Sequence, residues 1–199
     1  MKEKLTLRNV ILWGLALVLV ILFLVSFGAS VKWTGTMDGD YGTITLPHGF
    51  WGASAMTFTS GGHYAAEFIP VAARRGSVVG IIGAILLFLS AGGIALITLL
   101  LKDEKLKKIL TFVIAGVILV AGVLMFFTGG AFYYAYAKYM RVVLGLPVSV
   151  DQVKEALSNG HAYCVYGIVT GVFSILLSAG IVVSQLVIKD IKFIKSKEA

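Results

Sequence analysis

The sequence predicts an all-α transmembrane four-helix bundle with a small extracellular antiparallel β-sheet between its first and second helices. Three observations predict this fold class. The 199 residues are 58% hydrophobic and only 14% charged, with a mean hydropathy of +0.94, whereas soluble domains carry about 25% charged residues. Four long stretches contain no Asp, Glu, Lys or Arg. The segment between the first two stretches is rich in β-branched and aromatic residues, which favour strands.

Each uncharged stretch is longer than the ~20 residues that an α-helix needs to cross the hydrocarbon of a bilayer. Because no water is available there, every backbone N–H and C=O must be paired within its own segment, which makes the spans helices. We expect one integral membrane domain over residues 1–199, with transmembrane helices at 9–31, 77–101, 109–134 and 162–188.

The basic residues set the predicted orientation, because Lys and Arg concentrate on the cytoplasmic side of membrane proteins. With both termini cytoplasmic, 11 of the 17 basic residues lie inside: Lys2, Lys4, Arg8, Lys102, Lys105, Lys107, Lys108, Lys189, Lys192, Lys195 and Lys197. The other six lie outside: Lys32, Arg74, Arg75, Lys138, Arg141 and Lys154. The formal charge of +7 therefore indicates topology in a cell membrane and contact with the lipid bilayer, and we expect no nucleic-acid partner. In the alternative interpretation, residues 1–30 are a cleaved signal peptide and three helices are left.

The two predicted outer segments differ in character. In the first, residues 32–75, the runs 31–34, 41–46 and 55–59 are typical of strands, with turns at Asp38-Gly39 and Gly61-Gly62. We expect a small antiparallel sheet there. In the second, residues 138–160, Ser149 and Gln152 have the spacing of a capping box, which predicts a short helix over about 150–158.

Small residues recur along two of the predicted spans, where they allow a neighbouring helix to approach closely. They are Gly80 and Gly83 in the second span, and Gly167, Gly171, Ser174 and Ser178 in the fourth. Two interpretations stay open at this point. The stripes pack helices together within one chain, or they join one copy of the chain to another.

Residues that carry chemistry are scarce. The spans hold no ionisable Asp, Glu, Lys or Arg, and the chain has no CxxC, HExxH, GxSxG or P-loop motif. The single cysteine, Cys164, cannot form a disulfide within the chain. A divalent metal held by His48, His63 and Glu67 is conceivable if 63–67 is helical, but scattered loop residues explain these side chains more simply. We therefore expect no enzymatic activity, no cofactor and no metal.

One spacing points to a known family. Trp33 is followed, after seventeen intervening residues, by Trp51 in Gly49-Phe50-Trp51, and Ala72-Ala73-Arg74 precedes the second span. This pattern and the hydropathy layout resemble the claudin and peripheral myelin protein superfamily of four-span proteins. The family carries two cysteines in this loop, whereas Ser54 stands at the first of these positions and the second falls near residues 63–65. The lysine-rich short loops and aliphatic spans also look like small four-span proteins of low-GC bacteria.

These features favour a non-catalytic multi-pass protein that acts in scaffolding, in adhesion or as a subunit of a membrane complex through its outer β-rich loop. Its partner is another protein or a second copy of the chain. The residues that we expect either to contact this partner or to form the core of the loop are Trp33, Gly49, Phe50, Trp51 and Arg74. A small passive channel or transporter is the alternative, for which the spans offer only hydroxyls, glycines and Gln185.

Overall fold

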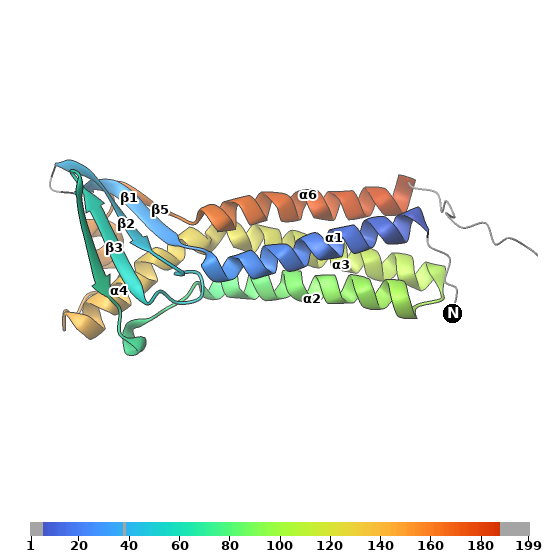
Figure 1. Cartoon of the computed structure of the whole chain (residues 1–199), viewed down its shortest axis with the longest axis horizontal. Coiled ribbons are helices and arrows are strands. Elements are labelled where there is room, and N and C mark those ends of the chain that lie inside the picture. The colour runs from blue at the N-terminus through green and yellow to red at the C-terminus, as the bar shows by residue number, and fades with distance from the viewer. Residues whose placement is uncertain (1–5, 38, 188–199) are drawn as a thin grey trace, which may run out of the picture.

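The computed structural model describes residues 6–37 and 39–187, and its main feature is a bundle of long helices that carries a smaller cap at one end (Figure 1). The bundle consists of α1 (Leu7–Val25), α2 (Val78–Leu100), α3 (Glu104–Phe126) and α6 (Val165–Val187). The terminal lysines at 2, 4, 189, 192, 195 and 197, on which the predicted orientation partly depends, lie outside the described residues.

The described residues contain four helical runs that are long and apolar enough to cross a membrane, as the uncharged stretches predict. Their bounds differ from the predicted spans. The third helix begins at Glu104 and not at residue 109, and the fourth begins at Val165 because a strand occupies Gly160–Tyr163. The first helix gives way to the 3-10 turn η1 (Ser26–Gly28) because strand β1 already begins at Val31. The third continues through the 3-10 turn η3 (Phe127–Gly130) into α4 (Ala131–Val143), which occupies the start of the predicted loop 138–160.

Side-chain caps explain where three of the bundle helices, α1, α2 and α3, begin. The Thr6 hydroxyl accepts a hydrogen bond from the Asn9 amide at 3.2 Å, and the Ser77 hydroxyl accepts one from the Gly80 amide at 3.1 Å. Asp103 accepts from the amides of Lys105 and Leu106 at the start of α3. Such caps satisfy amides that have no partner within the helix. The short connection between α2 and α3 leaves these two helices as antiparallel neighbours (Figure 1).

The predicted small-residue stripes lie inside the bundle. A Cβ added at Gly83 would lie 3.1 Å from Met125 of α3, and one added at Gly171 would lie 3.0 Å from the Gly122 carbonyl oxygen of the same helix. The Ser178 hydroxyl donates a hydrogen bond to the Ala115 carbonyl at 2.8 Å. These small residues therefore pack α2 and α6 against α3 within one chain. All six are buried: Gly80, Gly83, Gly167, Gly171, Ser174 and Ser178.

The cap is built on a five-stranded antiparallel sheet with the order β4-β3-β2-β1-β5. Three strands match the predicted runs: β1 (Val31–Met37), β2 (Asp40–Leu46) and β3 (Ala55–Ser60). The sheet is not confined to the segment between the first two bundle helices, because β5 (Gly160–Tyr163) pairs with β1 from just before α6. The remaining strand, β4 (His63–Phe68), was not expected, since its alanines and glutamate are depleted in strands.

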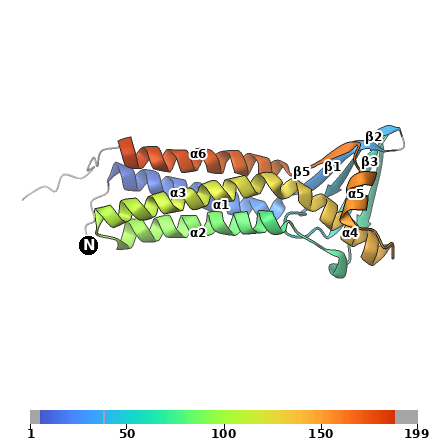
Figure 2. The ribbon, with the colours of Figure 1, turned by 180° about the vertical axis from the view of Figure 1, so that it is seen from behind.

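One face of the sheet is covered by α4 and α5 (Val150–Ala156), as Figure 2 shows, whereas Figure 1 looks onto the uncovered face. The predicted capping box of α5 is confirmed, with reciprocal bonds between Ser149 and Gln152. Trp33 lies on the covered face with 0% of its surface exposed, and its indole N–H donates to the Leu157 carbonyl at 3.1 Å. Its ring lies against Gly35 and Gly160, where a Cβ would collide with it.

The loop at 49–51 fastens the sheet to the bundle. Phe50 is fully buried, its ring lies edge-on to Tyr166 of α6 at 5.1 Å, and Gly80 of α2 leaves space for it. The Phe50 carbonyl accepts a hydrogen bond from the Ser77 amide at 2.8 Å. The Trp51 indole N–H donates to the Ser26 hydroxyl at 2.8 Å. Three separate parts of the chain thus meet at this loop.

We expect Phe50→Ala to lower the free energy of unfolding by roughly 3–5 kcal/mol, because it leaves a cavity that the rigid bundle cannot close. Thermal melting in detergent measures the effect. Phe173→Ala is the matched control, because Phe173 is 49% exposed on α6. Equal melting temperatures for the two variants would show that Phe50 does not hold the junction.

Candidate interaction surface

The sequence-predicted loop residues are placed in the junction and the core of the cap. Trp33 and Phe50 are fully buried, and Trp51 is partly buried. The Gly49 amide donates to the Leu46 carbonyl at 2.9 Å, within a tight turn. The Arg74 Nε donates to the Ile69 carbonyl at 3.2 Å, and its guanidinium lies 5.6 Å from the centre of the Phe68 ring. In this arrangement Trp33 and Phe50 form core, and a partner cannot reach them.

The uncovered face of the sheet, which we call the open face, presents a different set of side chains. Because neighbouring residues of a strand point to opposite faces, the register fixes which residues share it. Thr34 of β1 lies opposite Thr43 of β2, which lies opposite Thr59 of β3. Thr45 and Thr57 form the next row. The open face therefore has a floor of threonines at its centre.

The threonine hydroxyls are partly engaged with one another. Thr34 Oγ1 lies 3.4 Å from Thr43 Oγ1 and donates to the Tyr163 hydroxyl of β5 at 3.2 Å. Thr57 donates to the Thr45 carbonyl at 3.4 Å. Each hydroxyl keeps further donor or acceptor capacity. Rows of β-branched side chains are also stiff, so little conformational entropy is lost when a partner covers them.

Large rings flank this floor. Tyr41 of β2 is 74% exposed, Tyr64 of β4 is 69% exposed and Phe68 of β4 is 68% exposed. By strand alternation Lys32 is the only residue with a formal charge on the open face of the described strands, and the Arg74 guanidinium adjoins this face at the Phe68 ring. Exposed apolar rings in a nearly uncharged surface are typical of protein interaction sites.

Strand β4 also forms an edge of the sheet, and all six of its residues are exposed. An edge strand presents backbone N–H and C=O groups along one side, and another strand can pair with them. Natural sheets block such edges with charges or proline, whereas β4 carries only Glu67 as a charged residue. The edge therefore adjoins the open face as a second place for contact.

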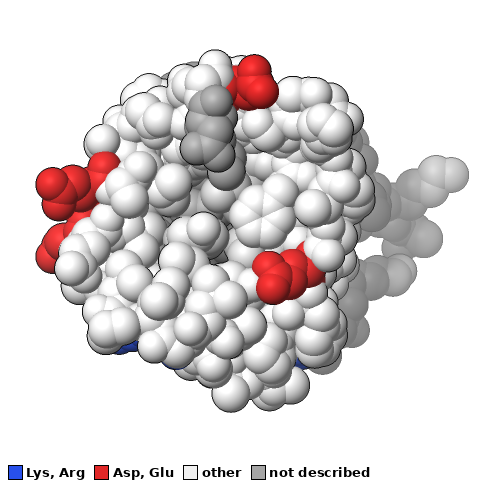
Figure 3. Space-filling model, turned by 90° about the vertical axis from the view of Figure 1, so that its left-hand side faces the viewer, with Lys and Arg blue, Asp and Glu red and all other residues white. Residues whose placement is uncertain are grey.

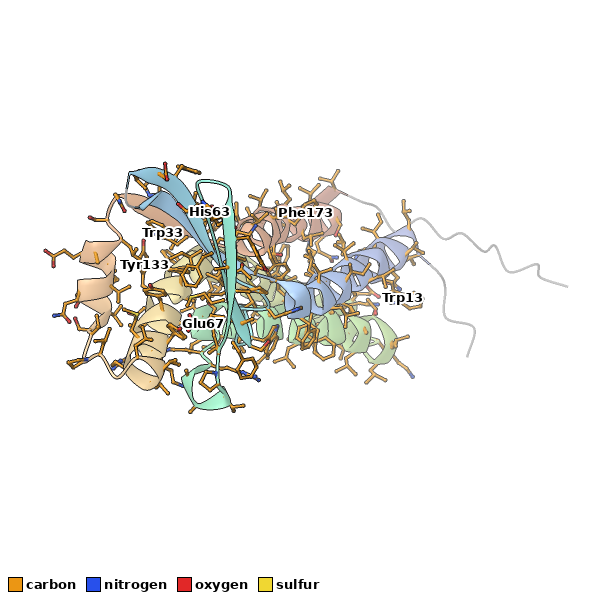
Figure 4. The ribbon with its side chains drawn as sticks, turned by 60° about the vertical axis from the view of Figure 1, so that its left-hand side comes forward. Trp13, Trp33, His63, Glu67, Tyr133 and Phe173 are labelled. Atoms are coloured by element: carbon orange, nitrogen blue, oxygen red, sulfur yellow. The ribbon has the colours of Figure 1, made fainter. Side chains whose placement is uncertain are left out.

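His63 and Glu67 lie on the covered side of β4, the side on which Trp33 and Tyr133 are seen in Figure 4. Because β4 is a strand and not a helix, these two residues are about 13 Å apart along the chain. His48 lies at the junction, where its Nδ1 is 3.1 Å from the Phe27 carbonyl oxygen. Within residues 6–37 and 39–187, no group of three or more His, Cys, Asp and Glu side chains is placed to hold a metal ion.

Sequence reasoning missed the open face, although a signal for it is present. The pattern Thr-x-Thr occurs three times, at residues 34–36, 43–45 and 57–59. Each occurrence predicts two hydroxyls on one face of a strand. Only the pairing register shows that these three strands are neighbours and that their threonines fall on the same face.

Comparison with known proteins adds no assignment, because no protein-family model and no curated protein matches the chain. The candidate surface is therefore defined by geometry alone. It consists of the open face and the adjoining β4 edge, on a cap that is anchored through Phe50 to a bundle of apolar helices.

Proposed function

We propose that the chain is a non-catalytic multi-pass protein of the cell membrane whose cap binds another protein, in scaffolding, in adhesion or as a subunit of a membrane complex. The observation that carries this proposal is the open face. Its three exposed rings, Tyr41, Tyr64 and Phe68, stand on a sheet whose other face is covered by the chain's own α4 and α5. A protein partner fits this surface because it is broad, nearly uncharged and bordered by an edge strand that can accept another strand.

Two properties of the bundle support insertion in a membrane as four transmembrane helices. A helix of 23 residues such as α2 or α6 is about 35 Å long, which suffices to cross ~30 Å of hydrocarbon. Large apolar side chains are exposed around the circumference of the bundle, among them Leu17 of α1, Phe88 of α2 and Leu176 of α6. In water these side chains would destabilise the protein, whereas lipid solvates them. The run from α3 to α4, at 40 residues, extends beyond the bilayer into the cap.

The proposed orientation has both termini in the cytoplasm and the cap outside. The end of the bundle opposite the cap carries Arg8, Lys102, Lys105, Lys107 and Lys108. This distribution supports the orientation by the positive-inside rule. The Arg8 guanidinium pairs there with Glu104 of α3.

A claudin-like arrangement is part of the proposal. It is supported by the position of Trp33 in β1, by the junction at Gly49-Phe50-Trp51 and by the antiparallel sheet that this loop forms. The resemblance implies a disulfide in the loop, which this chain lacks. At the position of the first cysteine, the Ser54 carbonyl instead accepts a hydrogen bond from the Ile69 amide at 2.8 Å, which closes the end of the β3–β4 hairpin.

A small channel or transporter is the second candidate, and one observation favours it. Thr170 Oγ1, Ser174 Oγ and Gln185 Nε2 are buried polar atoms on α6 without a hydrogen-bond partner. Unsatisfied polar groups inside a bundle are costly, and a transported solute or water would satisfy them. Both hydroxyl-bearing residues have 0% exposure, so this function requires another conformation of the bundle.

Cysteine labelling in intact cells tests the orientation. Cys164 is buried, and burial raises the pKa of its thiol, so it reacts slowly with maleimide. We expect a membrane-impermeant maleimide to label Asp151→Cys, on α5 and away from the open face, from outside and Lys105→Cys only after permeabilisation. The unaltered chain is the control for Cys164. The reverse pattern would refute the orientation, and labelling of both variants from outside would refute insertion.

Photocrosslinking on neighbouring residues of β4 tests the partner surface. We expect a photoreactive residue at position 64, on the open face, to give a protein adduct in native membranes, and one at position 63, on the covered side, to give none. Thr59→Lys should weaken the position-64 adduct roughly tenfold, because it buries an unpaired charge, whereas Asp151→Lys on α5 should not. An adduct of twice the chain mass identifies a second copy. Equal adducts at both positions, or none, would contradict open-face binding.

Flux through proteoliposomes separates the two candidate functions. The preferred function predicts that liposomes containing the protein are no more permeable to ions and small neutral solutes than empty ones. Thr170→Val and Ser174→Ala remove the two hydroxyls and serve as matched variants. Permeation that these substitutions abolish would establish the channel or transporter in place of the scaffold.

A further inference from the structure

A pocket of about 350 Å³ lies where the bundle meets the cap. It opens between the start of α2 and the turn η3, at which the helical run from α3 bends toward α4. The small residues Gly130 and Ala131 leave the space. Gly130 is exposed, and a Cβ at this position would meet no atom within 4 Å. The pocket is therefore open to the surroundings at the level where the proposed membrane ends.

The walls of this pocket have two chemical characters. Val78, Val79 and Phe127 form an apolar wall on the bundle side, and all three side chains are exposed. Arg75 and Tyr134 form a polar wall on the cap side, with the guanidinium 5.0 Å from the centre of the Tyr134 ring. A tyrosine at this level is typical of a membrane–water interface. The occupant must accordingly be amphipathic, with a negative group toward Arg75.

Further cations surround the polar wall. Lys154 Nζ of α5 lies 6.0 Å from the centre of the same Tyr134 ring. Lys138 Nζ of α4 donates to the Arg74 carbonyl at 3.0 Å, which brings a second lysine beside the connection that carries Arg75. Figure 3, which looks onto the end of the cap away from the bundle, shows acidic side chains there and blue only at its margin. Basic side chains are therefore scarce on the end of the cap away from the bundle.

We propose that this pocket binds a phospholipid of the outer leaflet, with the phosphodiester at Arg75 and Tyr134 and one acyl chain along Val78, Val79 and Phe127. Arginine binds phosphate oxygens through two parallel N–H donors, and the Tyr134 hydroxyl supplies another donor. The apolar wall belongs to helices that would stand in lipid, where an acyl chain is the available apolar ligand. This inference depends on the proposed insertion of the bundle in a membrane.

The test measures retention of added lipids by the full-length protein in detergent, by native mass spectrometry. Dioleoyl phosphatidylglycerol is compared with dioleoylglycerol, which has the same chains and no phosphate, and glycerol phosphate is added as a competitor without chains. We expect phosphatidylglycerol to be retained roughly tenfold more strongly than dioleoylglycerol, a factor that corresponds to about 1.4 kcal/mol. Glycerol phosphate should not displace it.

Two variants with matched controls locate the site. Arg75→Gln should reduce phosphatidylglycerol retention to the dioleoylglycerol level, whereas Arg141→Gln removes an equal charge from α4 outside the pocket and should not. Gly130→Leu fills the pocket and should weaken retention of both lipids, whereas Gly28→Leu, at another glycine with open space, should not. Melting temperatures confirm that each variant is folded.

Equal retention of the two lipids, or no effect of Arg75→Gln and Gly130→Leu, would overturn the proposal. Displacement by glycerol phosphate would show a site for soluble phosphate and would overturn the lipid assignment. Insertion itself is read from cysteine labelling, which does not involve Arg75. A chain that inserts as proposed and retains no lipid at this pocket would therefore refute only this inference.

Discussion

The position of the cap depends on the burial of Phe50 between the sheet and the bundle. Its ring takes up space that Gly80 leaves on α2 and lies against Tyr166 of α6, while its carbonyl is bonded to the Ser77 amide. One residue thus joins the loop after β2 to the starts of two bundle helices, α2 and α6. Trp51, stacked on Phe27 at 4.9 Å, adds the end of the first helix. A large aromatic ring is suited to this task because it buries much apolar area without a polar group that needs a partner.

The same packing explains why the chain forms this sheet without a disulfide. Trp33 fills the covered side of the cap, and Gly35 and Gly160 allow β1 and β5 to approach it closely. Asn159 donates a side-chain hydrogen bond to the Thr36 carbonyl at the end of this strand pair. Strand β5 of the second connecting segment therefore completes the sheet that the first segment begins. A hydrophobic core and backbone pairing hold the strands together in place of a disulfide.

The four apolar helices were predictable because a span must be long and uncharged, a property of the local sequence alone. Strand β5 was not, because its pairing with β1 joins residues about 130 positions apart in the chain. Strand β4 lacks the β-branched residues that mark its neighbours. Trp33, Phe50 and Tyr64 are all aromatic residues of the same loop, and the sequence alone could not separate the two buried rings from the exposed one. That distinction comes from the strand register and from the positions of α4 and α5.

The helical run from α3 to α4, which bends at the 3-10 turn η3, has a mechanical consequence. A helix resists bending far more than a loop does, so α4 and the sheet that it supports follow the direction of α3. Transmembrane helices tilt when the hydrocarbon around them becomes thinner. In a membrane, bilayer thickness would then affect the angle at which the sheet faces its surroundings.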